Sequence, residues 1–255
     1  MSDTLQGRTV LLTGASRGIG AATARALADA GAALVAHYGS HRAGAEEAVA
    51  QLPEAERLLV QADFATAGAA RRLWRDAVAW RGRIDVLVVN AATMPTTAFD
   101  GADDDWDDGW QTALRVNVLE PASLIREAVK HFVENGGGTV ITLSSWAAQR
   151  GSAIPSLNAY AASKAAIANV TQTIARNYAR QGVLAHVVAP GIVRTRLSEA
   201  SAAARGGIEG VNAALAMGEM VPPEEVAALI VFLATGTCRH LTGATLDLNG
   251  ASNIR

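Results

Sequence analysis

The chain has 255 residues, of which 50% are hydrophobic and 18% charged, and its 22 Lys and Arg nearly balance its 24 Asp and Glu. This length suits one large α/β domain, and the apolar content excludes general disorder. The formal charge of -2 gives no broad attraction to nucleic acid or to an anionic membrane, so we expect neither as a partner.

We expect the chain to be cytoplasmic. The few residues before the first strand-like run leave no room for a cleavable signal. The apolar run 226–234 is about half of the ~20 residues that cross a bilayer, and it predicts a packed helix. The single cysteine, Cys238, cannot form an internal disulfide, which favours a reducing compartment. We expect it to be a small buried side chain.

Short Val- and Leu-rich runs alternate with Ala-rich helical segments along the whole length, as in a parallel sheet with helices on both faces. Strands are expected at residues 9–12, 33–36, 58–60, 86–89, 139–143, 184–188 and 245–248. We therefore predict a Rossmann-type, doubly wound α/β fold. Its seven-stranded parallel sheet would form a single domain over residues 1–255.

The first strand leads into a glycine loop of the pattern G-x-x-x-G-x-G, formed by Gly14, Gly18 and Gly20. Glycines permit a tight turn and close approach of the backbone, while the N–H groups that open the following helix attract a pyrophosphate. We expect Ser16, Arg17 and Ile19 to join these glycines in binding a dinucleotide.

The same residues also fit a nucleophile elbow, G-x-S-x-G, with Ser16 as the nucleophile of a serine hydrolase. An elbow after the very first strand lacks the upstream loop that supplies part of the oxyanion hole. None of the histidines has a distinctive local setting, so we keep the hydrolase only as an alternative.

The end of the second strand indicates NADP(H) rather than NAD(H), although NAD(H) stays possible. An NAD site usually places an acid about twenty residues after the glycine loop, and here no acid lies between Asp29 and Glu46. Arg17, Ser40 and Arg42 could bind a 2′-phosphate instead. The alternative is that both arginines are ordinary solvated side chains.

Three later stretches carry further predictions. The acidic run 103–108 is expected to cap and begin a helix, where carboxylates complement the helix dipole, rather than to form a metal site, and we expect no metal. Ile167, Val170, Ile174 and Tyr178 form one apolar stripe of a long helix. The Gly-containing segment 194–221 is predicted to be a substrate lid.

Tyr160 and Lys164 lie four residues apart, on one face of a helix. A cation at that distance favours the phenolate and would lower the pKa of Tyr160 from ~10. Taken alone, such a pair is usually solvated. The expected strand 139–143 ends in Ser144 and Ser145, at the sheet edge where open α/β folds bind their ligands.

The motifs together resemble those of the short-chain dehydrogenase/reductase family, and within it the 3-oxoacyl-carrier-protein reductase-like branch. The matching residues run in order through the chain: Thr13-Gly14-x-x-x-Gly18-x-Gly20, Asn117, Ser145, Tyr160-x-x-x-Lys164 and Pro190 to Thr195. The resemblance implies hydride transfer between a nicotinamide cofactor and a small-molecule carbonyl or secondary-alcohol substrate.

It also implies residue roles. Tyr160 would be the general acid for carbonyl reduction, and Ser145 would hydrogen-bond the substrate oxygen. Lys164 would hold the nicotinamide ribose and depress the pKa of Tyr160. Asn117 would fix a water molecule on a proton path.

Further cofactor contacts are implied after the third, fourth and sixth strands: at Asp63 and Phe64, at Asn90, Ala91 and Ala92, and at Pro190, Gly191, Ile192 and Thr195. The family often has glycine where this chain has Ala92, and alanine still allows a backbone contact with the ribose. Asp63 alone also fits a helix cap.

A homotetramer, or at least a homodimer, is implied as well, with the helices that begin near Asp105 and Ser156 packed against their copies. Ala161, Ala165 and Ala168 are small enough for close helix approach there, and the alternative is that this alanine face meets the chain's own sheet. The other reading is a cofactor-binding regulator without turnover. Such a regulator should show damage among Asn117, Ser145, Tyr160 and Lys164, and all four are intact. The substrate is not identified, and Thr93, Met94, Trp146, Gln149, Ile154, Met217 and Met220 are expected to line its pocket.

Overall fold

The structure is a computed structural model that describes residues 5–202 and 206–254. Within these residues one sheet holds seven strands in the order β3-β2-β1-β4-β5-β6-β7, and every neighbouring pair is parallel. The strands are β1 (Thr9–Leu12), β2 (Ala33–Tyr38), β3 (Arg57–Gln61), β4 (Val86–Val89), β5 (Gly138–Leu143), β6 (Val183–Pro190) and β7 (Thr245–Leu248). The predicted single-domain, doubly wound fold is confirmed.

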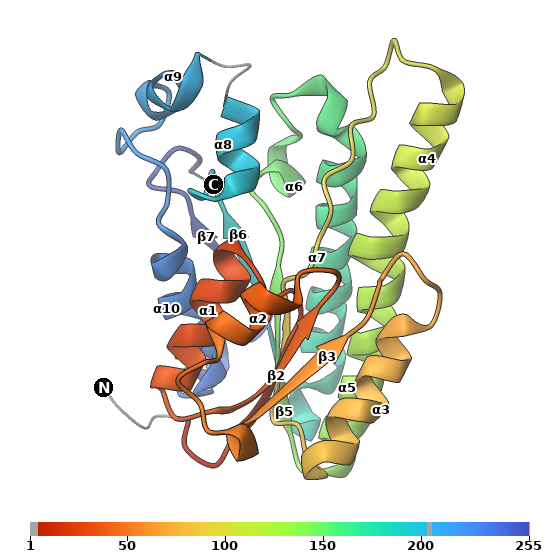
Figure 1. The fold of residues 1–255 in the computed structure, drawn as a ribbon, viewed down its shortest axis with the longest axis vertical. Coiled ribbons are helices and arrows are strands. Elements are labelled where there is room, and N and C mark those ends of the chain that lie inside the picture. The colour runs from red at the N-terminus through yellow and green to blue at the C-terminus, as the bar shows by residue number, and fades with distance from the viewer. Residues whose placement is uncertain (1–4, 203–205, 255) are drawn as a thin grey trace.

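Helices cover both faces of the sheet (Figure 1). One face carries α1 (Gly18–Asp29), α2 (Arg42–Ala48) and α10 (Pro223–Ala234). The other carries α3 (Ala69–Arg81), α5 (Glu120–Glu134) and α7 (Asn158–Tyr178), with α4 (Asp103–Leu114) beside α7. The short α8 (Arg196–Ala202) and α9 (Gly207–Ala213) lie beyond the carboxyl edge.

Alternation along β1 shows why the sheet needs two helical layers. Val10 and Leu12 pack in the core that contains α1 and α10, while Leu11 packs in the core that contains α3 and α5. All three are fully buried. Because successive strand side chains point to opposite faces, a strand that is apolar throughout must be covered on both sides.

The strand order reverses beside β1, which lies between β2 and β4. In an open parallel sheet, the loops leaving the carboxyl ends of two such strands run in opposite directions and leave a crevice between them. The glycine loop after β1 and the loop after β4 border this crevice. The topology thus positions the candidate site.

Three local expectations need correction. Cys238 is exposed, because it lies in the turn between α10 and a short 3-10 helix at the surface. Tyr178 is 38% exposed, since it is the last residue of α7, whereas Ile167 and Ile174 are buried as expected. The acidic run begins α4 as predicted, but the N-cap is Ala102 and no side chain caps this helix. Its carboxylates therefore act only through the helix dipole.

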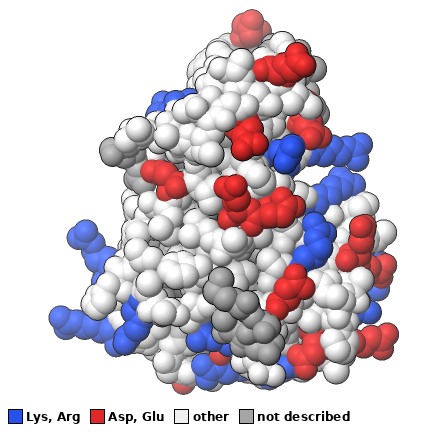
Figure 2. Space-filling view, turned by 90° about the vertical axis from the view of Figure 1, so that its left-hand side faces the viewer, with Lys and Arg blue, Asp and Glu red and all other residues white. Residues whose placement is uncertain are grey.

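No described helix combines the length and apolar character that crossing a bilayer requires. Figure 2 shows the side of the molecule that lies to the left in Figure 1. Lys and Arg side chains lie there among Asp, Glu and uncharged residues, and several of them are close to one another at the upper right. Basic and acidic groups are therefore mixed on this face.

Candidate active site

The loop between β1 and α1 presents backbone to the crevice. Gly14 and Gly18 have φ of +72° and +50°, which side-chain-bearing residues rarely adopt. A methyl group on Gly20 would collide with the carbonyl oxygen of Gly14. Arg17 is the N-cap of α1 and makes no side-chain cap, and the first turn has no acid. The N–H groups that open α1 therefore suit an anion such as a pyrophosphate.

Hydrogen bonds join this loop to the loop after β4. The Thr13 hydroxyl accepts bonds from the backbone N–H groups of Asn90 (2.9 Å) and Ala91 (3.0 Å). The Asn90 amide donates to the carbonyl oxygens of Thr13 (3.0 Å) and Gly14 (3.1 Å). The two sides of the crevice are thus fixed to each other before any ligand binds.

A cavity of about 690 Å³ extends along this crevice, and we name it the cofactor cavity. It brings together most of the residues predicted to contact a cofactor: Gly14, Ser16, Arg17, Gly18, Ile19, Gly20, Ser40, Asp63, Phe64, Asn90, Ala91, Ala92, Tyr160, Lys164, Pro190 and Thr195. A dinucleotide fits this combination of a long cavity, a glycine cradle and a helix N-terminus.

Three predicted contacts lie elsewhere. Gly191 and Ile192 line a neighbouring cavity. The Arg42 guanidinium lies outside the cofactor cavity, where Nε contacts Glu46 Oε1 (2.7 Å) and Nη1 donates to the Tyr38 hydroxyl (3.2 Å). Arg42 begins α2, and its spacing of four residues from Glu46 directs the side chain along that helix rather than into the crevice.

His37, near the end of β2, also lines the cofactor cavity and was not predicted. Its Nδ1 accepts the N–H of Gly14 (3.1 Å), and Nε2 lies 2.8 Å from the carbonyl oxygen of Ala62. The ring stacks on Phe64 at 4.6 Å. Burial lowers the pKa of His37 to about 4, although the Ala62 bond opposes this. The neutral ring therefore joins the glycine loop to the loop after β3, and a polar residue in an otherwise apolar strand was the sequence signal.

The catalytic candidates meet where the cofactor cavity joins a smaller one of about 220 Å³, which we name the substrate cavity. Tyr160 lines both cavities. Lys164 lines only the cofactor cavity and Ser145 only the substrate cavity. The fold therefore places the Tyr160 phenol at the junction of the two cavities, with Lys164 on one side and Ser145 on the other.

The pKa shifts correct one expectation. Burial lowers the pKa of Lys164 to about 8, and its Nζ donates to the carbonyl oxygen of Leu143 (2.7 Å). This ammonium lies 5.8 Å from the centre of the Tyr160 ring. Burial raises the pKa of Tyr160, and a hydrogen bond with Ser145 opposes that rise. Desolvation outweighs the Ser145 hydrogen bond in this structure, so the Tyr160 pKa shifts in the direction opposite to the predicted depression.

Asn117 stands behind the cavities rather than in them, with only 2% of its surface exposed. Its amide accepts the N–H of Thr93 (2.8 Å) and donates to the Thr93 carbonyl and to the Ser163 hydroxyl (both 2.9 Å). It lies in a π-helical turn, Arg115–Leu119, that joins α4 to α5. Such turns frequently mark functional sites. Through these bonds of Asn117, the turn connects the loop after β4 to α7, the helix that carries Tyr160 and Lys164.

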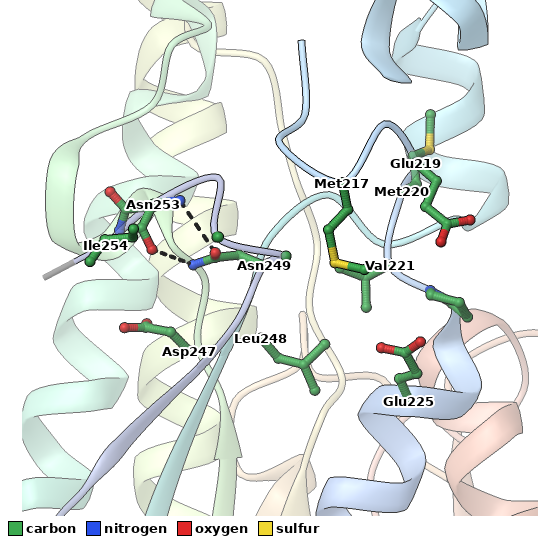
Figure 3. A pocket seen from close by; sticks show the side chains of 13 residues that line it. Met217, Glu219, Met220, Val221, Glu225, Asp247, Leu248, Asn249, Asn253 and Ile254 are labelled. Atoms are coloured by element: carbon green, nitrogen blue, oxygen red, sulfur yellow. Dashed lines mark hydrogen bonds between the residues drawn. The ribbon is translucent and has the colours of Figure 1, made fainter. Parts of the chain in front are cut away.

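The substrate cavity has Met94, Trp146 and Ile154 among its lining residues, as expected. Thr93 lines the cofactor cavity instead, and Gln149 bonds Asp247 (2.9 Å). Met217 and Met220 do not line the substrate cavity. They border a separate cavity of about 700 Å³ beside β7 and the start of α10 (Figure 3). Met217 is 68% exposed and Met220 is buried, because the 215–222 segment turns toward the C-terminal residues rather than toward Tyr160.

The segment 194–221 is fixed at its base. Arg194 N–H donates to the Val221 carbonyl, and Val221 N–H donates to the Ile192 carbonyl (both 2.9 Å). Gly206 and Gly207 have positive φ at the start of α9. Residues 203–205 of the predicted lid lie outside the described residues.

Ser16 lines the cofactor cavity, and none of the described histidines hydrogen-bonds its hydroxyl. A serine hydrolase needs a base in contact with its nucleophile. The geometry of the described residues gives the elbow interpretation no support.

Comparisons with known proteins agree with this geometry. The family model that matches residues 14–251 is described as enoyl-(acyl carrier protein) reductase. The chain is 32% identical to 3beta-hydroxysteroid dehydrogenase 1 of Eggerthella lenta, covering 100% of this chain and 97% of that protein. It is 33% identical to cis-4-hydroxycyclohexanecarboxylate dehydrogenase of Sinomonas cyclohexanicum, covering 98% of each.

A solved structure is also similar. The crystal structure of 3-oxoacyl (acyl-carrier-protein) reductase from Agrobacterium tumefaciens C58, with NADP bound, superposes with a TM-score of 0.85. It shares 32% identity and covers 96% of this chain and 94% of its own.

Proposed function

The chain belongs to the short-chain dehydrogenase/reductase family, and on that premise we propose that it is an NADP(H)-dependent oxidoreductase that interconverts a small carbonyl compound and the corresponding secondary alcohol. The observation that carries the proposal is the position of Tyr160 at the junction of the two cavities, with Lys164 on one side and Ser145 on the other. The named relatives act on different substrates, so family membership alone does not select one.

Each residue of the site has its own role in the proposed reaction. When bound, the reduced nicotinamide supplies a hydride to the carbonyl carbon and becomes the oxidised cofactor. The Tyr160 hydroxyl gives its proton to the carbonyl oxygen, and the Ser145 hydroxyl donates a hydrogen bond to the same oxygen as charge develops there. Lys164 holds the ribose. Asn117 fixes the loop at Thr93 against the catalytic helix through Ser163. In the oxidative direction Tyr160 acts as the base.

The preference for NADP(H) is supported by two observations. Arg17, Ser40 and His41 line the cofactor cavity close to the end of β2, and β2 carries no carboxylate. The similar reductase from Agrobacterium tumefaciens has NADP bound. We assign binding of the 2′-phosphate to Arg17 and Ser40. Arg42 contributes less, because its guanidinium already contacts Glu46 and Tyr38.

Assembly as a homotetramer or homodimer in the cytoplasm belongs to the same proposal. Leu114, at the end of the α4 helix expected to meet its copy, is exposed, and so is Leu119 in the π-helical turn that follows α4. Ala161 is buried within its own chain, so only Ala165 and Ala168 of the predicted contact residues keep some exposure. A strictly monomeric mass by light scattering would reject the assembly.

A substrate panel tests the activity. Purified protein is mixed with NADPH, and the nicotinamide absorbance is followed after addition of small ketones, cyclic ketones, steroid ketones and 3-oxoacyl thioesters. We expect absorbance to fall with at least one class. A regulator of the same fold would bind NADPH in calorimetry and oxidise none of it, and a hydrolase would neither bind nor oxidise it.

A further inference from the structure

The substrate cavity contains a single charged side chain among its described lining residues, and that side chain is Arg150. The other described lining residues are uncharged. The larger ones include Met94, Trp146, Ile154, Leu157 and Tyr160, and Ser144, Ser145, Ser152, Thr195 and Ser198 add hydroxyl groups. Asp and Glu are absent from this described lining. Arg150 is itself exposed, so water screens part of its charge, but a cation without a carboxylate partner in a cavity lined by uncharged groups still favours an anionic ligand.

Arg150 is held in place by its neighbours. It ends the short helix α6 (Ala147–Arg150), and its Cζ lies 4.4 Å from the centre of the Trp146 ring. This distance is within the ~6 Å range of a cation–π contact. The backbone of Trp146 is bonded to β6, since its backbone N–H donates to the Pro190 carbonyl oxygen (3.0 Å). Arg150 is exposed, and the Trp146 ring limits the orientations of its guanidinium.

The donors of Arg150 remain available for a ligand. No described carboxylate lies within ion-pair distance of its guanidinium. The neighbouring Gln149 instead turns to Asp247 (2.9 Å). A planar guanidinium with free N–H groups suits two parallel hydrogen bonds to a carboxylate.

We infer, building on the proposed function, that the substrate is a small oxo acid, or the matching hydroxy acid in the reverse direction. Its carbonyl would lie between Ser145 and Tyr160, and its carboxylate would contact Arg150. One arginine balances a monoanion, whereas a phosphate dianion would call for a second cation that the described lining lacks. The cavity of about 220 Å³ also suits a small molecule, because sites for drug-sized ligands usually start at ~300 Å³.

Turnover with matched substrates gives the first test. kcat/KM is measured with NADPH for 4-oxopentanoate, 5-oxohexanoate and 6-oxoheptanoate, and for the amide of each, which has the same shape without the charge. We expect the wild type to prefer at least one acid over its amide by about tenfold or more. Arg150→Met should remove this preference by lowering kcat/KM for the acid and leaving that for the amide unchanged.

The control variant is Arg180→Met, which removes an exposed arginine in the short 3-10 helix Ala179–Gln181 that follows α7, on the opposite edge of the sheet. It should leave both values unchanged. If the amides are reduced as well as the acids, or if Arg150→Met lowers both equally, the anionic substrate class is wrong while the proposed oxidoreductase function stands.

Binding gives a second test that does not require turnover. Hexanoate and hexanamide are titrated by calorimetry into the wild type and Arg150→Met, each saturated with NADP⁺. We expect hexanoate to bind the wild type at least tenfold more tightly than hexanamide, and Arg150→Met to abolish the difference. Equal affinities in the wild type, or a difference that survives in Arg150→Met, would overturn the inference. Failure of every ketone in the turnover assay would instead count against the proposed function.

Discussion

The cofactor cavity and the substrate cavity meet at Tyr160, but they are built from different parts of the chain. The cofactor cavity is formed by strand ends and a glycine-rich backbone, and its two sides are joined by the bonds of Thr13 and Asn90. The substrate cavity is formed by the short α6, the residues after it and the turn after β6. The ends of the sheet strands therefore shape the cofactor cavity, whereas loops shape the substrate cavity.

The strongest test of this comparison removes the hydroxyl group of Tyr160, a residue that lines both cavities. Tyr160→Phe keeps the ring and its packing but removes the proton donor. We expect NADPH affinity to stay close to wild type while kcat falls by the ~10²- to 10⁴-fold typical of general acid–base catalysis. Calorimetry and turnover on a substrate identified by the panel separate the two effects. Near wild-type turnover would show that another group supplies the proton.

A second test concerns the cofactor cavity, which His37 lines. His37 has a folded pKa of about 4 and an ordinary value of 6.5, so above pH 6.5 both states are neutral and its stability contribution is complete. Between pH 6.5 and 4 the unfolded chain takes up a proton that the folded protein does not, and the free energy of unfolding falls by up to about 3 kcal/mol.

His37→Gln should therefore flatten the pH dependence of stability in that window, measured by urea unfolding at a series of pH values. It should also weaken NADPH binding, because the bond to Gly14 is disturbed. The exposed His240 gives the control, and His240→Gln should retain the wild-type slope. An unchanged slope in His37→Gln would show that His37 is not the group responsible.

A third test separates the two arginines near the end of β2. Arg17→Ala should raise the KM for NADPH by roughly tenfold with little change for NADH, because a charge-assisted bond to the 2′-phosphate is lost. Arg42→Ala should change both values less, since its guanidinium already contacts Glu46 and Tyr38. A clear preference of the wild type for NADH, or a larger effect of Arg42→Ala, would contradict the assignment.

The smallest expected effect concerns segment 194–221, next to the substrate cavity. We propose that segment 194–221 closes over the substrate cavity, pivoting above the pair formed by Val193 and Val221. Amide exchange in residues 207–213 should slow when NADP⁺ and a substrate analogue are both bound, while exchange in α7 stays the same. Equal exchange of the segment in both states would argue against a lid.

Sequence reasoning predicted the sheet well because the signals are local. Each strand is a short apolar run bounded by turn residues, and the glycine loop, Ser145 and the Tyr160–Lys164 pair lie at fixed distances from these runs. β2 and β6 continue to Tyr38 and Pro190, past the predicted ends, because the neighbouring strands supply hydrogen-bond partners there.

Only the tertiary structure decided which side chains line the two cavities. Arg17 and Arg42 look equivalent in the sequence, yet only Arg17 lines the cofactor cavity, because the first turn of α2 directs Arg42 toward Glu46. Met217 and Met220 lie beside β7 rather than near Tyr160. The bonds of His37 to Gly14 and Ala62, and the position of Arg150 against Trp146 in the substrate cavity, depend on how separate loops pack together. Periodicity and spacing report the order of elements along the chain, whereas the direction of a side chain on a loop is set by contacts with residues far away in sequence.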